Sequence, residues 1–260
     1  PYYNQGLDGV IVQELGALRI MKENFPGLEL HASTQMTITS VYGARMLKDF
    51  GCSRVVTSRE MSLDEIRRVR EEVDVEIESF VHGALCYCYS GQCLMSSLIG
   101  GRSGNRGRCA QPCRLPYRVY EGQHGQGKPA VMNRENEKYV LSLKDLCTLD
   151  ILPDILEAGV YSLKIEGRMK SPRYTAGVVS IYRKYADRYL DHGREGYHVE
   201  PEDRKMLLDL FDRGGFTSGY YEEHNGRDMV ALKEKPEFRE GNQKLFDYLD
   251  RAYVEAELKE

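Results

Sequence analysis

Short apolar runs alternate with amphipathic segments through the first two thirds of the chain. The apolar runs are rich in β-branched residues and resemble buried strands, whereas apolar residues recur every three to four positions in the segments between them, as in helices. The predicted strands are Leu7–Gln13, Leu28–Ser33, Arg54–Ser58, Val75–Val81, Tyr139–Leu143 and Ser162–Glu166. The predicted helices are Leu15–Asn24, Ile38–Phe50, Ser62–Glu72, Leu146–Ala158 and Arg173–Asp191. This alternation predicts repeated βα units around a parallel sheet.

Residues that interrupt or cap helices lie where these units should reverse direction. Pro26 and Gly27 separate the first helix from the second strand, and Gly51 and Gly159 follow two other predicted helices. Ser62, followed three residues later by Glu65, is typical of a helix start. The boundaries of the helices are therefore predicted by local chemistry as well as by periodicity.

The predicted fold class is α/β, a parallel (β/α) TIM-like barrel. Six strands do not close a barrel of eight, and the sequence opens in what reads as a helix-to-strand connection, so we expect an N-terminally truncated barrel that lacks about two βα units. A smaller, open, doubly wound sheet is the alternative that six strands would satisfy.

The regular alternation divides the 260 residues into two predicted regions. Residues 1–191 form the barrel portion, and residues 83–136 within it are a cysteine- and arginine-rich insertion of a length that is usually functional. Residues 192–260 form a small C-terminal extension with charged helical and polar stretches.

Composition is ordinary for a soluble globular protein, with 41% hydrophobic and 29% charged residues. No apolar stretch predicts a membrane span and no secretory signal is visible, so we expect a cytoplasmic protein. The net charge of -4 gives no overall attraction to nucleic acid, so such a partner would need a local basic surface. Seven cysteines, several of them crowded together, fit reduced thiols or a metal better than paired extracellular disulfides.

Four cysteines of the insertion form the central motif. Cys86, Cys93, Cys109 and Cys113 could converge on a tetrahedral zinc or on an iron–sulfur cubane, with Cys147 as a reserve ligand. Six residues separate the first pair and three the second, whereas structural zinc sites favour two closely spaced pairs, so zinc is the weaker alternative. Buried apolar thiols are the other alternative. Cys86 ends a predicted strand, and barrel enzymes place their chemistry at that end.

A basic segment accompanies these cysteines. No acidic residue occurs from Gly83 to Tyr120, while five arginines do: Arg102, Arg106, Arg108, Arg114 and Arg118. Guanidinium groups bind phosphates and carboxylates through paired hydrogen bonds, and Tyr87, Tyr89 and Tyr117 could stack on an unpaired base. Alternatively, the arginines only offset the negative charge of a thiolate cluster.

Charged residues on two predicted strands are candidates for catalysis. Glu78 and His82 lie four residues apart and would share a face if alternation holds, and either could transfer protons. Lys164, Glu166 and Arg168 share a face by the same period. An internal ion-pair network is the alternative for these three residues.

These motifs together resemble peptidase family U32, the collagenase-like protease family. The resemblance covers nearly the whole chain to about Met229. It is carried by the segments 78–86, 90–96, 105–114, 141–146 and 162–171 and by the Gly-Phe-Thr-Ser-Gly stretch that ends at Gly219.

The resemblance implies an oxygen-independent hydroxylase that carries a [4Fe-4S] cluster. Members act on tRNA wobble uridine, on a ribosomal RNA cytidine or on the ubiquinone ring, and the RNA enzymes use prephenate as the hydroxyl source. The Cys109-x-x-x-Cys113 pair is similar to the RNA branches, in which the second cysteine is a ligand, whereas Cys147 matches the fourth ligand of the ubiquinone branch. Lys164 and Arg168 are then candidates for holding a carboxylate such as that of prephenate. RNA is the expected partner, with a paralogous subunit or a homodimer as further possibilities.

Two other functions remain open from the sequence. The family name suggests a peptidase, although neither a His-Glu-x-x-His motif nor a Gly-x-Ser-x-Gly motif occurs, and Cys88 with His82 is the remaining nucleophile and base pair. A non-catalytic RNA-binding partner subunit is the third possibility, against which the intact segment 164–168 argues.

Overall fold

The computed structural model describes residues 2–122, 130–168, 170–223, 226–233 and 242–255. Its strands are β1 (Gly9–Val12), β2 (Glu29–Ala32), β3 (Arg54–Val56), β4 (Glu76–Gly83), β5 (Asp145–Cys147), β6 (Val160–Ile165) and β7 (Phe216–Thr217). Its α-helices are α1 (Leu15–Asn24), α2 (Val41–Asp49), α3 (Leu63–Glu72), α4 (Met95–Gly100), α5 (Leu152–Glu157), α6 (Pro172–His192), α7 (Pro201–Leu210) and α8 (Gln243–Leu249). Single turns of 3-10 helix are η1 (Tyr3–Gln5), η2 (Thr34–Met36), η3 (Pro112–Arg114), η4 (Leu149–Ile151) and η5 (Arg227–Met229), and η6 (Asp250–Val254) is a π-helix.

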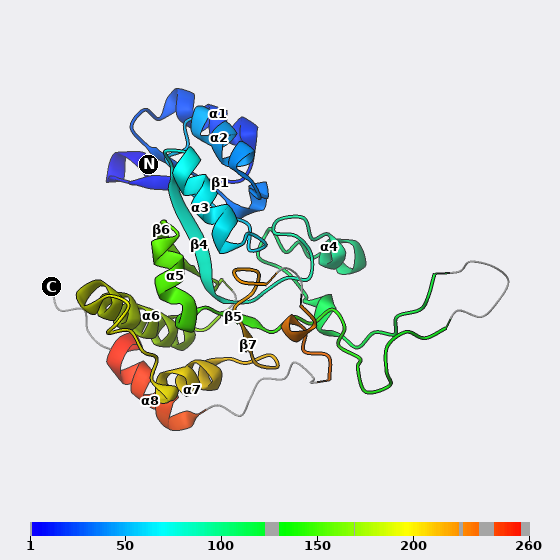
Figure 1. The fold of residues 1–260 in the computed structure, drawn as a ribbon. Coiled ribbons are helices and arrows are strands. Elements are labelled where there is room, and N and C mark those ends of the chain that lie inside the picture. Colours follow the sequence, from blue (N-terminus) through cyan, green and yellow to red (C-terminus); the bar gives the residue numbers. More distant parts are fainter. Residues whose placement is uncertain (1, 123–129, 169, 224–225, 234–241, 256–260) are drawn as a thin grey trace.

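Most of the sheet is parallel. β1, β2, β3 and β4 pair in sequence order, and β6 also pairs with β4 in parallel (Figure 1). This order is that of consecutive βα units, whereas a doubly wound sheet reverses its strand order at a switch point. The sheet does not close in the described residues. The structure therefore confirms a mixed α/β fold with a mainly parallel sheet and does not confirm a closed barrel.

One predicted strand is wrong. Tyr139–Leu143 is a turn with a single bridge from Leu143 to Val230, and β5 forms afterwards, from Asp145. β5 pairs antiparallel with the end of β4, and the helix expected from Leu146 starts only at Leu152. Local β-propensity favoured the apolar segment, but tertiary partners select a strand that begins with an aspartate.

Helix starts follow their caps. Ser62 and Glu65 form the capping box expected for α3, with each side chain accepting a hydrogen bond from the other residue's backbone N–H. α2 starts at Val41 and not at Ile38, because the Ser40 side chain accepts from the Gly43 N–H and caps the helix there.

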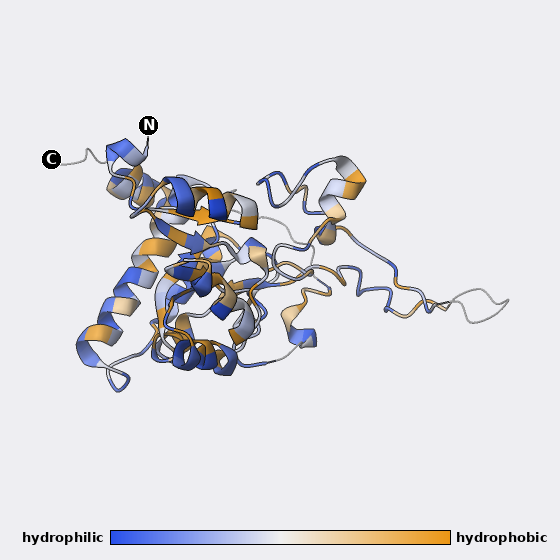
Figure 2. Cartoon of the chain, turned by 90° about the horizontal axis from the view of Figure 1, so that it is seen from above, coloured by the Kyte–Doolittle hydropathy of each residue, from blue (hydrophilic) through white to orange (hydrophobic). Residues whose placement is uncertain are grey.

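β4 lies at the centre of the molecule, between α3 and α5 (Figure 1). Its residues after Glu76 are all buried, and its Ile77 and Val81 belong to the same hydrophobic core as Leu149. Hydrophobic and hydrophilic residues are interspersed along the helices (Figure 2), and in α3 the hydrophobic Leu63, Ile66 and Val69 are the buried ones. None of the helices in the described residues has the length and apolar character to cross a membrane.

Candidate functional site

The cysteine-rich insertion is attached to the carboxyl ends of the parallel strands. Just beyond β2, the Gln35 side chain donates to the Asn105 carbonyl at 3.1 Å, and the Thr37 hydroxyl donates to the Ser90 carbonyl at 2.8 Å. Just beyond β3, the Arg59 N–H donates to the Ser90 hydroxyl at 3.1 Å. Because β4 itself leads into the insertion, three neighbouring strands hold it at the edge where α/β enzymes carry out their chemistry.

Gly91 makes this attachment close. Its φ is +80°, and a Cβ there would lie 2.6 Å from the Gln35 carbonyl oxygen. Only glycine fits both the left-handed backbone and this approach. The turn between Cys86 and Cys93 is thereby pressed against the end of β2.

The four candidate thiols gather in this insertion. Desolvation raises the pKa of Cys86, and the charges of Cys93 and Cys109 raise it as well. Desolvation also raises the pKa of Cys113, to which the charges of Cys86 and Cys109 contribute. Cys86 is exposed as a residue, yet its thiol is desolvated by surrounding protein atoms. Cys86 and Cys113 therefore each have two of the other candidate cysteines as electrostatic neighbours.

Of the two further cysteines, Cys88 lies among the same thiols, with Cys93, Cys86 and Cys113 as neighbours, whereas Cys147 has different neighbours. Cys88, which the cluster hypothesis left out, hydrogen-bonds with Cys93, and burial together with that bond raises the pKa of its thiol. Cys147 lies on β5, buried, and receives a hydrogen bond from the Tyr182 hydroxyl at 3.8 Å. Its electrostatic neighbours are Asp150 and Arg204. All seven cysteines are free thiols, and no group of three or more His, Cys, Asp or Glu within the described ranges is arranged around a single metal ion.

Arg114 supports the site from inside the protein. Its guanidinium donates to the Leu85 carbonyl at 2.7 Å, to the Ser142 hydroxyl at 2.9 Å and to the Leu143 carbonyl. Burial, and then the charge of Arg213, lowers its pKa. Arg114 therefore fixes the residue before Cys86 and does not offer its hydrogen-bond donors to solvent.

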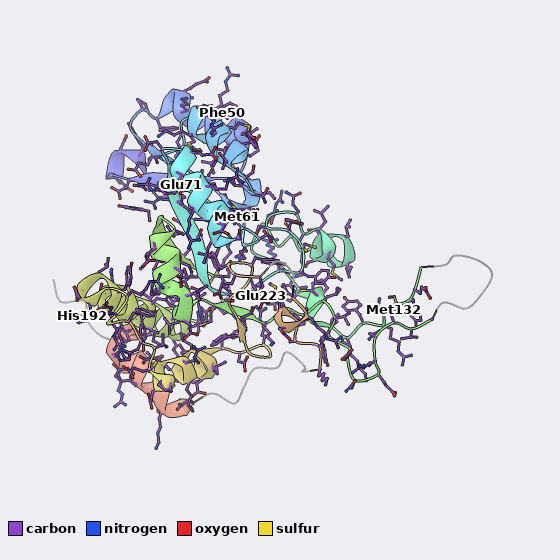
Figure 3. The ribbon with its side chains drawn as sticks, in the orientation of Figure 1. Phe50, Met61, Glu71, Met132, His192 and Glu223 are labelled. Atoms are coloured by element: carbon purple, nitrogen blue, oxygen red, sulfur yellow. The ribbon has the colours of Figure 1, made fainter. Side chains whose placement is uncertain are left out.

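The other four arginines of the insertion, Arg102, Arg106, Arg108 and Arg118, are exposed. Among them, Arg102 donates to the Arg108 carbonyl at 2.9 Å and so closes the turn before Cys109. Arg118 lies two residues before Tyr120, which is bridged to Val131, and the arm that carries Met132 extends away from the sheet (Figures 1 and 3). The exposure of these four side chains is compatible with a basic surface, which stays a prediction.

Arg213 and Asp145 are neighbours of the site that the sequence did not reveal. Arg213 forms a buried ion pair with Asp145 and donates to the Gln111 side chain at 3.2 Å, two residues before Cys113. Burial disfavours the charged guanidinium, but Asp145 more than compensates and raises the pKa of Arg213. The only sequence signal was the Arg213-Gly214-Gly215 turn, which carries no indication of a partner 68 positions earlier.

The charged strand residues form ion pairs across the sheet. Glu78 pairs with Lys164 and, at 3.4 Å, with Arg54. Burial by itself would raise the pKa of Glu78, but the two cations lower it by a larger amount. The pKa therefore lies below its usual value, and the carboxylate is ionised. Glu166 pairs with Arg59 at 3.0 Å and accepts the backbone N–H of Arg168. Lys164 and Glu166 are thus held in ion pairs, as the network alternative expected, with partners from β4 and from the segment after β3.

Arg168 connects the end of β6 to the insertion. A Cβ on Gly107 would lie 2.9 Å from its side-chain Cδ, so the two segments touch directly before Cys109. Lys164 lies near the end of β6, and Arg168 lies three residues beyond that end. Lys164 contacts Glu78, whereas Arg168 contacts the cysteine segment.

His82 is enclosed by aromatic rings. The ring centroids of Tyr182 and Phe216 lie 5.5 Å from that of its imidazole, and Tyr174 lies at 6.1 Å. Burial lowers its pKa to about 4. A register shift between Phe80 and His82 breaks the alternation on which a common face with Glu78 depended. The described contacts of His82 are those of a neutral core histidine.

Lys170 is a proton-transfer candidate that the sequence did not single out. Its ammonium lies over the Phe211 ring, and burial, then Arg213, lowers its pKa to about 7. An amine that titrates near neutrality can give or take a proton at physiological pH. Asp145 and Glu166 are among its electrostatic neighbours, which places it beside the ion pairs described above.

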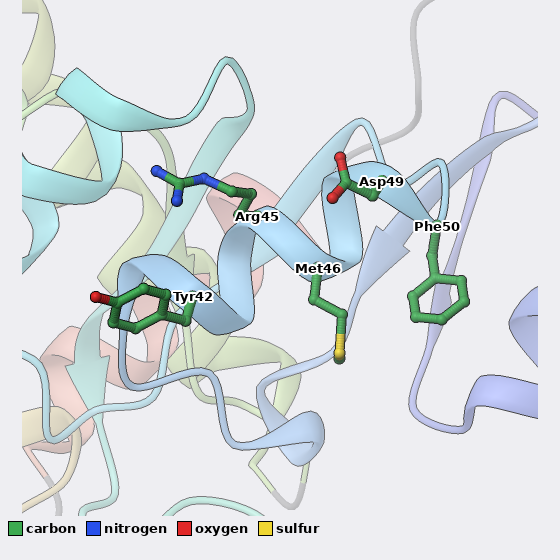
Figure 4. A pocket seen from close by; sticks show the side chains of 5 residues that line it. All are labelled: Tyr42, Arg45, Met46, Asp49 and Phe50. Carbon is green, nitrogen blue, oxygen red and sulfur yellow. The ribbon is translucent and has the colours of Figure 1, made fainter.

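Two cavities differ in their relation to this site. One of about 400 Å³ is lined by Tyr42, Arg45, Met46, Asp49 and Phe50, all from α2 and its end (Figure 4). Another of about 210 Å³ is lined by Thr39, Glu60, Met61, Glu65, Tyr87, Tyr89 and Tyr220. The second includes residues of the cysteine insertion and the first does not.

The family model for Peptidase family U32 matches residues 1–231. The chain belongs to peptidase family U32. The match covers the sheet, the cysteine insertion and the Gly-Phe-Thr-Ser-Gly stretch, and so confirms the resemblance drawn from the motifs.

Relatives in family U32 carry different names. The chain is 42% identical to tRNA hydroxylation protein P1 of Bacillus subtilis, with 92% of this chain and 62% of that protein covered. It is also 42% identical to the 23S rRNA 5-hydroxycytidine C2501 synthase of Escherichia coli, with coverages of 91% and 35%. A collagenase of Porphyromonas gingivalis is 33% identical, with coverages of 83% and 52%. The chain thus spans between about a third and two thirds of these relatives.

The solved structure of the U32 peptidase Mk0906 matches with a TM-score of 0.27 and 19% identity, over 29% of this chain and 31% of that one. This similarity is too low to define the fold of the present chain.

Proposed function

We propose that this chain is the cluster-binding part of an oxygen-independent RNA hydroxylase, with tRNA wobble uridine as its expected target. The observation that carries the proposal is the gathering of Cys86, Cys93, Cys109 and Cys113 at the carboxyl ends of the strands, beside exposed arginines. The names of two relatives at 42% identity, one for tRNA and one for ribosomal RNA, support RNA as the substrate.

The donor set fits a [4Fe-4S] cluster. Cys86 and Cys113 each lie close enough to other candidate thiols for those thiols to raise their pKa, and thiolates are the usual ligands of such clusters. Cys113 suits the fourth position better than Cys147, because Cys86 and Cys109 are among its electrostatic neighbours. Zinc remains the alternative metal. When bound, the cluster would supply the redox chemistry that hydroxylation without oxygen requires.

The protein groups around the thiols have separate parts in this proposal. Arg114 and Arg213 place positive charge near Cys86 and Cys113, which favours their thiolate forms. Lys170 can move a proton near neutral pH. Arg168, at the end of β6 beside the insertion, can bind a carboxylate such as that of prephenate, the expected hydroxyl source.

A peptidase is the second candidate, because one relative is named a collagenase. Its nucleophile would be Cys88 with His82 as base. Burial raises the pKa of the Cys88 thiol, and its hydrogen bond is with Cys93, while His82 is held among aromatic rings. A raised thiol pKa gives less thiolate and hence a weaker nucleophile.

Nucleoside mass spectrometry decides between the two functions. A strain that lacks the complete protein should lose one hydroxylated nucleoside from its tRNA or ribosomal RNA. The protein should restore it, and a Cys86→Ala variant should not. An unchanged RNA profile together with lost gelatin cleavage would establish the peptidase and end the hydroxylase proposal.

A further inference from the structure

The cavity of about 210 Å³ beside the cysteine insertion has the features of a small-molecule subsite. Its walls come from four segments: Thr39 before α2, the connection from β3 into α3, the turn between Cys86 and Cys93, and the stretch after β7. It is smaller than a site for a drug-sized ligand, which is roughly 300–1,000 Å³. Its size suits one planar ring.

Glu60, which lines this cavity, has one buried carboxylate oxygen that no donor among the described residues contacts. Its Oε1 accepts the Ser90 N–H at 3.0 Å, which fixes the carboxylate. Its Oε2 is buried, and no hydrogen-bond partner for it exists within the described ranges. A buried carboxylate oxygen without a donor is costly, and a ligand with an N–H group would remove that cost.

Three tyrosines form the apolar walls. Tyr87 and Tyr89 are 54% and 61% exposed, so their rings are available to a ligand. Tyr220 is half-buried, and its neighbour Tyr221 is fixed by a hydrogen bond of 2.6 Å to the Phe80 carbonyl. After desolvation, the charges of Glu60, Tyr89 and Tyr87 raise the pKa of Tyr220, which shows that these groups converge. Aromatic rings around one carboxylate are a suitable surface for stacking a base.

The cavity shares the turn between Cys86 and Cys93 with the candidate cluster ligands. Tyr87 stands between Cys86 and Cys88 in the sequence, and the Ser90 that binds Glu60 belongs to the same turn. Met61, another lining residue, is found on the side of α3 that faces α4 (Figure 3). A ring bound here would therefore lie next to the thiols.

We propose that this cavity receives a single pyrimidine base of the RNA, turned out of its stack. The base stacks on Tyr87, Tyr89 or Tyr220, and Glu60 Oε2 accepts an N–H from its Watson–Crick edge. Uracil offers N3–H and cytosine offers its exocyclic amine. Holding that edge leaves the C5–C6 edge of the base free. This inference rests on the proposed function, since it names the substrate subsite of the same centre.

The test uses a seven-nucleotide RNA whose only base is a central uracil, the other six positions being abasic. Binding to the anaerobically purified protein is followed by fluorescence anisotropy. The wild type should bind the uracil RNA roughly tenfold more tightly than the same RNA with 3-methyluracil, which has no N3–H. Phosphate contacts are identical in both probes, so the ratio reports on the base alone.

Glu60→Gln is the diagnostic variant. Its Oε1 can still accept from Ser90, but an amide that donates replaces Oε2, so the preference for uracil over 3-methyluracil should disappear. Glu71→Gln is the matched control. It removes the same charge as Glu60→Gln, but Glu71 is exposed at the far end of α3 (Figure 3). Tyr89→Leu should weaken binding of the uracil RNA by roughly tenfold and leave a wholly abasic RNA unaffected.

Equal wild-type affinity for the two bases, or a preference retained in Glu60→Gln, would overturn the base-binding proposal. So would the absence of binding to any of these RNAs. Each of these three results leaves the RNA hydroxylase proposal intact if the nucleoside profile of the deletion strain is altered. A normal nucleoside profile, in contrast, would overturn the hydroxylase proposal whatever the oligonucleotides do.

Discussion

The Nε of Arg213 donates to both carboxylate oxygens of Asp145, at 3.0 and 3.2 Å, in an ion pair from which solvent is almost excluded. The pair joins β5 to the turn before β7, and its guanidinium also binds Gln111 beside the cysteines. It therefore connects the stability of the sheet to the shape of the candidate site.

Removing one partner of this pair should be costly. Arg213→Ala leaves the Asp145 carboxylate buried without its cation, so the free energy of unfolding should fall by about 3–5 kcal/mol. Urea denaturation measures the change. Arg183→Ala, which breaks the exposed pair with Asp187, is the control and should cost about 1 kcal/mol or less. Equal effects of the two variants would show that the buried pair has no special role.

His82 should make stability depend on pH. An unfolded histidine titrates near pH 6.5, whereas burial lowers the pKa of His82 to about 4. As the pH falls below about 6.5, the unfolded chain takes up a proton that the folded chain does not. The free energy of unfolding should therefore fall by about 2 kcal/mol between about pH 6.5 and pH 5, and this contribution should be constant above that range.

The measurement is a series of urea denaturations of the wild type and of His82→Phe, whose ring suits the aromatic surroundings. Other groups titrate alike in both proteins, so the difference between the two curves isolates His82. Parallel curves from pH 5 to pH 6.5 would contradict a neutral, buried histidine.

Two arginines of the insertion should respond differently to substitution. Arg118 is exposed, so Arg118→Ala should weaken RNA binding and lower the slope of log affinity against log salt by about 0.7–0.9 for each phosphate that the variant no longer neutralises. Arg114→Ala should instead lower the free energy of unfolding by roughly 2 kcal/mol, because three acceptors lose their donor. Filter binding at several salt concentrations and urea denaturation separate the two effects. An Arg118→Ala variant with an unchanged salt slope would remove this surface from the RNA site.

The choice of fourth ligand can be read from the metal content. Under anaerobic purification the wild type should carry about four irons and four sulfides per chain. Cys113→Ser should lose most of this iron, whereas Cys147→Ser should retain it, because Cys147 has Tyr182, Asp150 and Arg204 as neighbours and not the other thiols. The opposite pattern would make Cys147 the ligand, and one zinc per chain in a colourless protein would exclude the cluster.

Much of the fold follows from local sequence. The first strands and helices lie close to their predicted positions, since alternation and caps such as Ser62 with Glu65 act over a few residues. The cysteine motif predicted the family, which the family model confirms, whereas the set of cluster ligands stays a prediction. The division into residues 1–191 and 192–260, part of which lies outside the described residues, stays a prediction.

Only the tertiary structure decided how distant charges are paired and where the sheet continues. Asp145 begins a strand because Arg213 neutralises it, and Glu78 takes Lys164 as its partner across 86 positions. Glu60 showed no motif at all and becomes notable only when Ser90 and three tyrosines surround it. Periodicity records which face of an element is apolar, but partners are chosen by three-dimensional proximity and by the need of buried polar groups for hydrogen bonds.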